Sequence, residues 1–313
     1  MVQKLEKIKW LIKNSPMVKI KYRYQGKAGT VYAKCEWYSL SGSIKDRVAY
    51  QVFYDAYKSG ALKSGDRIVE VSSGNMGISV SAIANITKNP TTIIMPRNMS
   101  EERKKLIRLY GAKLILVDDF NSAFSLCKKM QKKGWFCPQQ FANVNNIKAH
   151  QNITAKEIME KLNGKKITYF VSGVGTAGTL MGCGGYLKKK MGVKVIAMQP
   201  KNAQILTSTK RAKPHKIQGI SDEIVPKLFS KNIVDGYVSI SDNDAVAMAQ
   251  KLCKNLSLPV GISGGANFLA SVLVGGAVTV FPDDNKKYLS TTLSGKTMSK
   301  LANQIKLISV EYI

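Results

Sequence analysis

The sequence has few of the residues that build disulfide frameworks and metal centres. It contains five cysteines and two histidines in 313 residues. The cysteines, at positions 35, 127, 137, 183 and 253, form no CxxC pair and no metal-ligand spacing with the histidines. We therefore expect reduced thiols, a reducing compartment and no bound metal.

Long hydrophobic runs are also missing. The most hydrophobic stretch, residues 268–281, is interrupted by Gly275 and Gly276 and is too short to cross a bilayer. The first residues contain no apolar segment of the kind found in signal peptides. These absences argue against a membrane protein and favour a soluble, cytoplasmic one.

Acidic residues are scarce. The chain has 20 acidic and 48 basic side chains, which gives a formal net charge of +28 and raises the question of a nucleic-acid partner. The lysines are scattered, however, and short runs such as 132–133 and 188–190 lie at the ends of helix-like segments, where cations favour the helix dipole. Because no basic stretch is interleaved with aromatics, we expect neither nucleic acid nor a membrane as partner.

Short β-branched runs alternate with helical patterns along the chain. The runs predict strands at 31–35, 67–71, 91–95, 113–117, 167–172, 193–198 and 277–281. The helical patterns cover 46–59, 77–86, 101–110, 120–133, 151–162 and 244–256. Such alternation predicts an α/β fold with parallel sheets covered by helices on both faces. The candidate functional motifs fall into the groups 45–103 and 173–290, so we expect two lobes with the site in the cleft between them.

A lysine and a distant glycine-rich loop together indicate a cofactor site. The loop 173–179 has the Gly-x-Gly-x-x-Gly pattern of dinucleotide binding, but the next strand ends in Met-Gln-Pro at 198–200, without the acidic residue that a dinucleotide needs. Thr176 and Thr179 instead add hydroxyl donors, which suit a phosphate monoester. A Schiff-base lysine, Lys45, together with a phosphate cradle predicts a site for pyridoxal 5'-phosphate (PLP).

Several segments follow, in order, the pattern of one enzyme family. From about residue 10 to about residue 292 the chain resembles the cysteine synthase (O-acetylserine sulfhydrylase) family, related to cystathionine β-synthase. The resemblance implies the two-lobed, tryptophan synthase β-like architecture of fold-type II PLP enzymes. It rests on residues 14–18, 41–47, 72–77, 95–103, 140–143, 175–179, 217–220, 261–266, 281–283 and 288–291.

The resemblance also implies roles for individual residues. Lys45 would hold PLP, and Asn75 and Ser263 would bond its ring oxygen and its pyridine nitrogen. The cofactor phosphate would be bound by Gly175, Thr176, Ala177, Gly178 and Thr179, and the substrate by Ser72, Ser73, Met76, Gln140 and Gly219. Helix capping is an alternative role for the segment that begins at Ser72, and for Ser263 ahead of a helix expected near Ala266. The family also implies a smaller, mobile lobe at 38–144, a larger lobe at 1–37 and 145–313, and a homodimer.

The chain departs from the family pattern at a few positions. Ser39-Leu40 replaces a common Asn-Pro, Gly264 replaces a second serine, and Ser72 replaces a common threonine. Asp222 and Glu223 stand where sulfide-using members usually have small residues. Two carboxylates there would repel hydrosulfide and could accept a proton from water, a thiol or an amine. The alternative is that they form a solvated acidic turn.

Together these features predict PLP-dependent β-replacement or β-elimination on a small β-substituted L-amino acid through an aminoacrylate. The expected reaction is cysteine synthase-like, in which O-acetylserine or a similar substrate reacts with sulfide. Release of sulfide from L-cysteine by a lyase, desulfidase or lanthionine synthase-type enzyme remains an alternative, in which Asp222 or Glu223 would act on water or a thiol. A non-catalytic binding protein is a third reading, against which the presence of Lys45 argues.

Overall fold

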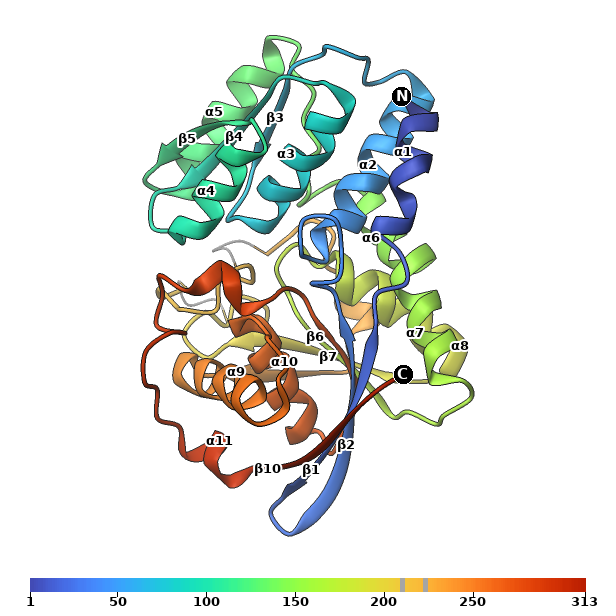
Figure 1. Ribbon diagram of the computed structural model, residues 1–313, viewed down its shortest axis with the longest axis vertical. Coiled ribbons are helices and arrows are strands. Elements are labelled where there is room, and N and C mark those ends of the chain that lie inside the picture. The colour runs from blue at the N-terminus through green and yellow to red at the C-terminus, as the bar shows by residue number, and fades with distance from the viewer. Residues whose placement is uncertain (209–211, 222–224) are drawn as a thin grey trace.

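The computed structural model describes residues 1–208, 212–221 and 225–313. Asp222 and Glu223 therefore lie outside the described residues. Within the described part of the chain, the strands form a three-stranded and a seven-stranded sheet (Figure 1). The smaller sheet has the order β3 (Ile68–Val71), β4 (Thr91–Pro96), β5 (Lys113–Val117). The larger has the order β10 (Lys306–Tyr312), β1 (Met17–Tyr24), β2 (Lys27–Cys35), β9 (Val278–Phe281), β6 (Tyr169–Gly173), β7 (Lys194–Pro200), β8 (Gly236–Ile240).

Parallel pairing dominates both sheets, as the alternating pattern predicts. The smaller sheet is parallel throughout, and the larger is parallel from β2 through β9, β6 and β7 to β8. The β10-β1-β2 edge is antiparallel, and of its strands only β2 was predicted, at 31–35. Basic residues interrupt the apolar run of β1 at Lys19, Lys21 and Arg23, and most of β10 is exposed, so neither strand has a continuous β-branched run. Half-solvated strands of this kind are typical of antiparallel edges.

Helices cover both faces of the smaller sheet. Successive strand residues point to opposite faces, and Ile68 packs in one core cluster while Val69 packs in another. The first cluster contains residues of α1 (Val2–Ile8), α2 (Lys45–Ser59), α3 (Asn75–Thr87) and α4 (Glu101–Leu109). The second contains residues of α5 (Phe120–Lys132).

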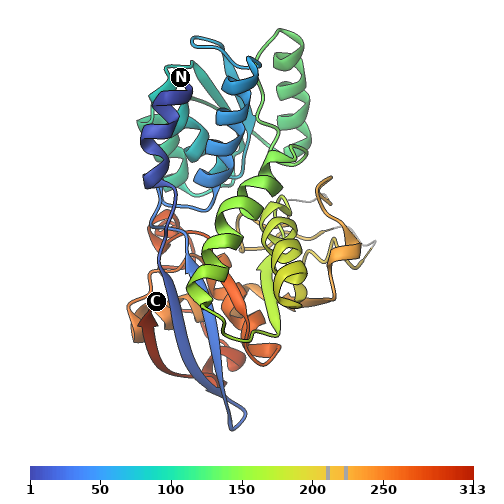
Figure 2. The same cartoon turned by 90° about the vertical axis from the view of Figure 1, so that its right-hand side faces the viewer.

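The larger sheet is covered in the same way. On one face it packs against α9 (Asp242–Leu256) and α10 (Ile262–Leu273). Figure 2 shows α7 (Ala155–Leu162) and α8 (Gly185–Met191) on the other face. The remaining elements are α6 (Asn145–Ala149), α11 (Lys300–Gln304), the π-helical segments η2 (His150–Thr154) and η3 (Leu180–Gly184), and the 3₁₀ segments η1 (Lys9–Leu11), η4 (Lys231–Ile233) and η5 (Asn285–Tyr288).

The apolar stretch 268–281 is divided between a helix and a strand. It contains the second half of α10 and the whole of β9. Gly275 and Gly276 separate them with φ of 89° and 111°, which side chains with a Cβ rarely adopt. Among the described residues, no helix is long and apolar enough to cross a membrane. The smaller sheet lies inside the range 38–144 expected for the smaller lobe, and the lobe boundaries stay a prediction.

Candidate active site

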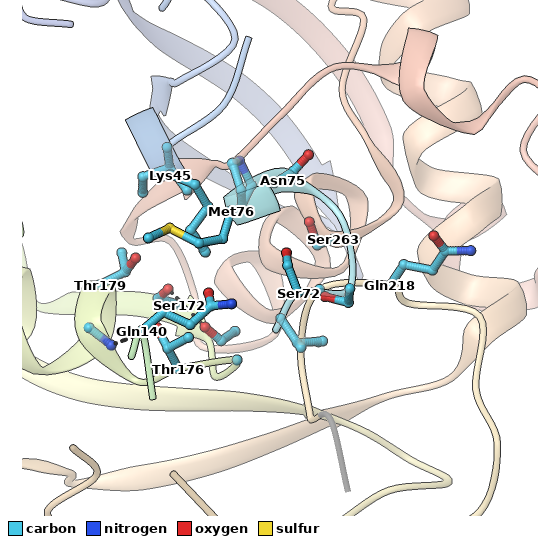
Figure 3. Close-up of a pocket in the computed structure, with 18 of the residues that line it drawn as sticks. Lys45, Ser72, Asn75, Met76, Gln140, Ser172, Thr176, Thr179, Gln218 and Ser263 are labelled. Carbon is cyan, nitrogen blue, oxygen red and sulfur yellow. Dashed lines mark hydrogen bonds between the residues drawn. The ribbon is translucent and has the colours of Figure 1, made fainter. Parts of the chain in front are cut away.

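One pocket gathers the sequence motifs from opposite halves of the chain (Figure 3). It has about 660 Å³ of empty space, counting the part open to solvent. Segments that follow β3, β6 and β9 at their carboxyl ends contribute to its wall, as expected for ligand sites of α/β sheets. Its lining includes the predicted residues Lys45, Ser72, Ser73, Asn75, Met76, Gln140, Gly175, Thr176, Ala177, Gly178, Thr179, Gly219 and Ser263.

Lys45 is the first residue of α2, and hydrogen bonds hold the loop that precedes it. The buried carboxylate of Asp46 accepts hydrogen bonds from both the backbone N–H and the hydroxyl of Ser41. The backbone N–H of Lys45 donates to Ser43 Oγ at 3.3 Å. These contacts fix the start of α2 and therefore the point from which the lysine side chain enters the pocket.

A buried network of charged side chains holds α2 in place at Arg47, two residues after Lys45. Arg47 is fully buried and donates to the carboxylates of Glu36 and Glu157, at 2.5 Å and 2.8 Å for the shortest contacts. Lys34 adds a second cation, 2.9 Å from Glu157. Burial would raise the pKa of Glu157, but the hydrogen bond and charge of Arg47 lower it to about 2. The network thus ties α2 to β2 and α7 through paired charges.

The glycine-rich loop after β6 has the shape of an anion cradle. A Cβ at Gly175 would lie 2.4 Å from the carbonyl oxygen of Gly219, and one at Gly178 would lie 1.8 Å from Asn146 Oδ1. Both positions therefore require glycine. Within the part of the chain that the structure describes, no acceptor takes the backbone N–H of Gly175, Thr176 or Ala177. Unpaired N–H groups on such a loop suit the oxygens of a phosphate group.

Two hydroxyls beside the loop are held by side chains from α6 and η2. Thr176 Oγ1 accepts a hydrogen bond from Asn146 Nδ2 at 2.8 Å, which leaves its own O–H available to donate. Thr179 Oγ1 lies 3.3 Å from His150 Nε2. Burial and the charges of Lys45 and Arg47 lower the pKa of His150 well below its ordinary value. The imidazole is therefore neutral, so it adds no charge to the cradle.

Polar groups also line the rest of the pocket. Asn75 donates through Nδ2 to Asp283 at 2.7 Å, and its Oδ1 is buried without a partner among the described residues. Ser263 is the second residue of α10, and the N-cap position is Gly261. The suggestion that Ser263 caps a helix near Ala266 is therefore wrong. This lining and the glycine cradle fit PLP, a planar cofactor with polar ring substituents and a phosphate arm.

The segment after β3 begins with a serine that is tied to α3. Ser72 Oγ accepts hydrogen bonds from the backbone N–H groups of Gly74 and Gly77, at 3.0 Å and 2.9 Å. Ser72 thus does serve the start of the helix, and its own O–H remains available to donate into the pocket. Gln140 is held beside it, because its Nε2 donates to the carbonyl of Val71 at 2.8 Å.

Sequence reasoning gave no role to three polar residues that line the pocket, namely Arg103, Ser172 and Gln218. Arg103 is buried, packs over the ring of Tyr288 at 4.6 Å and donates to Gln218 Oε1 at 2.7 Å. Both Arg103 and Gln218 lie in segments that carry the family resemblance, so the motifs contained the signal. Their partnership spans 115 positions of sequence, and only the fold reveals it.

The family is decided by the comparison with family models. The model described as "Pyridoxal-phosphate dependent enzyme" matches residues 8–281. The chain belongs to this family. The expected architecture, the PLP cofactor and the assignment as an enzyme are thereby confirmed.

Curated relatives and solved structures agree with that assignment. Cysteine synthase of Staphylococcus aureus (strain N315) is 34% identical, with 94% of this chain and 98% of the relative covered. Cysteine synthase B of Campylobacter jejuni is 36% identical, with 92% and 98% covered. The crystal structure of a hydrogen sulfide-producing enzyme from Fusobacterium nucleatum is 39% identical, covers 100% of both chains and has a TM-score of 0.94. An aspartate-to-asparagine mutant of that enzyme has been solved with an α-aminoacrylate intermediate.

Proposed function

We propose that this PLP-dependent enzyme catalyses β-elimination and β-replacement with L-cysteine as the substrate that enters and sulfide as the group that leaves. The observation that carries the proposal is a single pocket that combines a lysine, an anion cradle and a second set of donors around Ser72 and Gln140. Full-length similarity to a hydrogen sulfide-producing enzyme, at 39% identity, supports this direction.

The cofactor would be held by residues from both groups of motifs. Lys45 would bind it covalently through its amine, the loop 175–179 would hold its phosphate, and Asn75 and Ser263 would contact its ring. When bound, PLP withdraws electrons from the substrate α-carbon, which makes loss of the α-proton and of a β-substituent feasible. Ser263 is uncharged, so it would leave this withdrawal weaker than a carboxylate partner would, which favours prompt β-elimination over transamination.

The substrate carboxylate would bind between Ser72, Ser73 and Gln140. The Ser72 hydroxyl and the N-terminal end of α3 supply donors for an anion. Met76 and Gly219 would border the substrate side chain. With the amino acid held in this way, the Lys45 amine would accept the α-proton.

We propose that Asp222 or Glu223 acts on the second half of the reaction. A carboxylate there would take a proton from incoming water or thiol, and the acids would disfavour hydrosulfide as a nucleophile. The aspartate mutant of the Fusobacterium enzyme, solved with α-aminoacrylate, fits a role for an acid at this stage.

Cysteine synthesis from O-acetylserine and sulfide is the second candidate. It is favoured by the cysteine synthases that match more than nine-tenths of the chain. We also propose a homodimer, on the basis of the family resemblance.

Mixing the enzyme with one substrate at a time distinguishes sulfide release from L-cysteine from cysteine synthesis. The loaded enzyme is mixed with L-cysteine, O-acetylserine, O-phosphoserine and L-serine in turn, and the absorbance of the bound cofactor and the released sulfide are measured. We expect L-cysteine to change the absorbance and release sulfide, and added thiol to restore the spectrum. A response to O-acetylserine alone, restored by sulfide, would overturn the proposed direction in favour of cysteine synthesis.

A further inference from the structure

Two of the free cysteines lie against each other outside the active-site pocket. Cys127 of α5 and Cys137 have their sulfurs 3.4 Å apart, although they come from different segments of the chain. All five cysteines are free thiols. A disulfide requires a separation of about 2.0 Å, so these two sulfurs are one small displacement away from bonding.

The pair lines a second pocket, which has about 890 Å³ of empty space including its mouth. Aromatic rings of Phe124 and Phe141 and the amide of Gln131 surround the thiols. The buried side chain of Glu70 also lines it, and Glu70 Oε2 has no partner among the described residues. The thiols are therefore reachable from a cavity that has both apolar surface and a free polar group.

The contact between the two sulfurs favours a single thiolate in the pair. Their hydrogen bond, in which either sulfur can be the donor, lowers the pKa of Cys127 and raises that of Cys137, and Cys137 is the less buried of the two. The thiolate is the attacking species in exchange chemistry, so one thiol of the pair attacks and its neighbour resolves.

The second pocket shares a wall with the candidate active site. Val71 and Gln139 line the second pocket, whereas the next residue of each segment, Ser72 and Gln140, lines the first. Gln139 has a φ of 55°, which is unusual for a residue with a Cβ. Gln140 is only three positions after Cys137, so a displacement of Cys137 would reach the Gln140 carboxamide through a short stretch of backbone.

We infer that Cys127 and Cys137 form a dithiol site that exchanges with small organic disulfides and that its oxidation displaces Gln140. One thiolate of the pair attacks one sulfur of the small disulfide and releases one thiolate. The other thiol of the pair then gives its proton to the released thiolate and attacks the protein sulfur of the mixed disulfide, which releases the second small thiol. Two protein thiols and one small disulfide thus give one protein disulfide and two small thiols.

Thiol counting on the PLP-loaded enzyme tests the site without any turnover. The enzyme is equilibrated in buffers of oxidised and reduced glutathione, the free thiols are alkylated, and intact mass and peptide maps are recorded. We expect two alkylation sites to disappear together and one cross-link between residues 127 and 137. An unchanged thiol count across the buffers, or a cross-link between other cysteines, would overturn the site.

Single variants test whether both thiols are needed for the cross-link. Cys137→Ser and Cys127→Ser should each stop at a glutathione adduct on the remaining thiol of the pair. Cys253→Ser is the matched control, because Cys253 is half-buried, lies outside the pair and contacts Asn285. This control should form the 127–137 cross-link like the parent. A cross-link that persists in either pair variant, or the absence of an adduct in both, would contradict a dithiol site at residues 127 and 137.

A binding measurement tests the coupling to the active site. L-serine contains no thiol, so its dissociation constant can be read from the cofactor absorbance in both redox states. Loss of one hydrogen bond from Gln140 should weaken L-serine binding about fivefold in the disulfide form. The same difference should be absent in Cys137→Ser treated identically. Equal binding in the two states of the parent would overturn the coupling while leaving the thiol count as a separate result.

Discussion

Gly175 and Gly178 in the cradle are glycines because other atoms lie close to them, rather than because their backbone conformation demands glycine. Gly175 faces a backbone carbonyl, which cannot move aside as a flexible side chain would, and Gly178 faces the Asn146 amide. By contrast Ala177 has a φ of 69° although it carries a Cβ. A strained residue between two obligatory glycines is typical of a loop shaped by the ligand that it binds.

Lys45 is predicted to carry the cofactor. Borohydride reduction of the loaded enzyme followed by peptide mapping should place the pyridoxyl group on Lys45, because its side chain lines the pocket that contains the phosphate cradle. Lys287 is a suitable comparison, since it is buried nearby but donates to the Gly42 carbonyl at 2.6 Å. A label on Lys287 or any other lysine would refute the assignment.

Thr176 and Thr179 are predicted to hold the cofactor phosphate. Each hydroxyl bonded to a charged group contributes about 1.5 to 3 kcal/mol, so the double Thr→Val variant should retain PLP about a hundredfold less tightly or worse. Equilibrium dialysis against PLP measures the change. Thr168→Val is the control, because Thr168 is an exposed residue ahead of the loop. Retention equal to that of the control would show that the hydroxyls do not bind the phosphate.

Asp222 and Glu223 are predicted to affect only the second half-reaction. General-base catalysis typically contributes roughly 10²–10⁴-fold, so Asp222→Asn or Glu223→Gln should slow the step that follows addition of a nucleophile by about that factor. The first absorbance change after mixing with substrate should keep nearly its normal rate. Stopped-flow spectroscopy resolves the two phases. If both variants complete the second phase at the parent rate with every nucleophile, the acids form a solvated turn.

At the level of elements, the buried network around Arg47 joins helix α2 and strand β2 to helix α7. Its members come from β2, the segment after it, α2 and α7, and Ser15 completes the set of acceptors for Arg47. The positive charges of Lys34 and Arg47 are thus balanced inside the protein by the carboxylates of Glu36 and Glu157. Arg47 is two residues after Lys45 in the first turn of α2, so the network supports the position of the residue that is proposed to bind the cofactor.

Glu157 gives this network a pH dependence with a definite sign. Its pKa is lowered from 4.5 to about 2, so its contribution to stability is present above pH 4.5 and is lost as the pH falls towards 2. The shift corresponds to about 3 kcal/mol of unfolding free energy. Urea unfolding at pH 5 and pH 3 should show a larger loss of stability for the parent than for Glu157→Gln. Parallel losses in both proteins would contradict the prediction.

At the level of the whole molecule, side chains bridge the segments around α3 and α4 to the segment 282–291. Arg103 contacts Asp283 and Tyr288, Asn75 donates to Asp283, and Glu102 accepts two hydrogen bonds from Ser290. The bridge connects helices that pack on the smaller sheet to a segment that follows β9 of the larger sheet. The bridge therefore connects the part of the pocket wall beside the smaller sheet to the part beside the larger sheet.

Replacing Arg103 should destabilise this bridge strongly. Arg103→Met removes one partner of a buried ion pair and leaves the Asp283 carboxylate without its ion-pair partner, which should cost about 3–5 kcal/mol. Arg97→Met is the matched control, because Arg97 forms an exposed pair with Asp118 in the same part of the chain and should cost less than about 1 kcal/mol. Urea denaturation of the two variants measures the difference. Equal stabilities would show that the buried pair does not join the halves.

The sequence by itself determined the chemistry and most of the framework. Most strands and helices of the α/β pattern follow from local apolar periodicity and could be predicted, because each is encoded in a contiguous run. Two that were not predicted are β8, where buried and exposed residues alternate, and α8. The glycines, threonines and Lys45 could be singled out for the same reason, since their motifs are short and ordered along the chain. The antiparallel strands β1 and β10 could not be predicted from apolar runs, because basic side chains interrupt β1 and much of β10 is exposed.

Only the tertiary structure decided which distant residues meet. The sequence did not reveal that Arg103 contacts Gln218, that Asn146 supports Thr176, or that Cys127 lies against Cys137. The physical reason is that such contacts depend on how the sheets and helices pack, whereas a sequence motif reports only the conformation and chemistry of its own segment. The structure also places Ser263 inside the first turn of α10, which excludes helix capping by Ser263, and its contact with the cofactor stays a prediction.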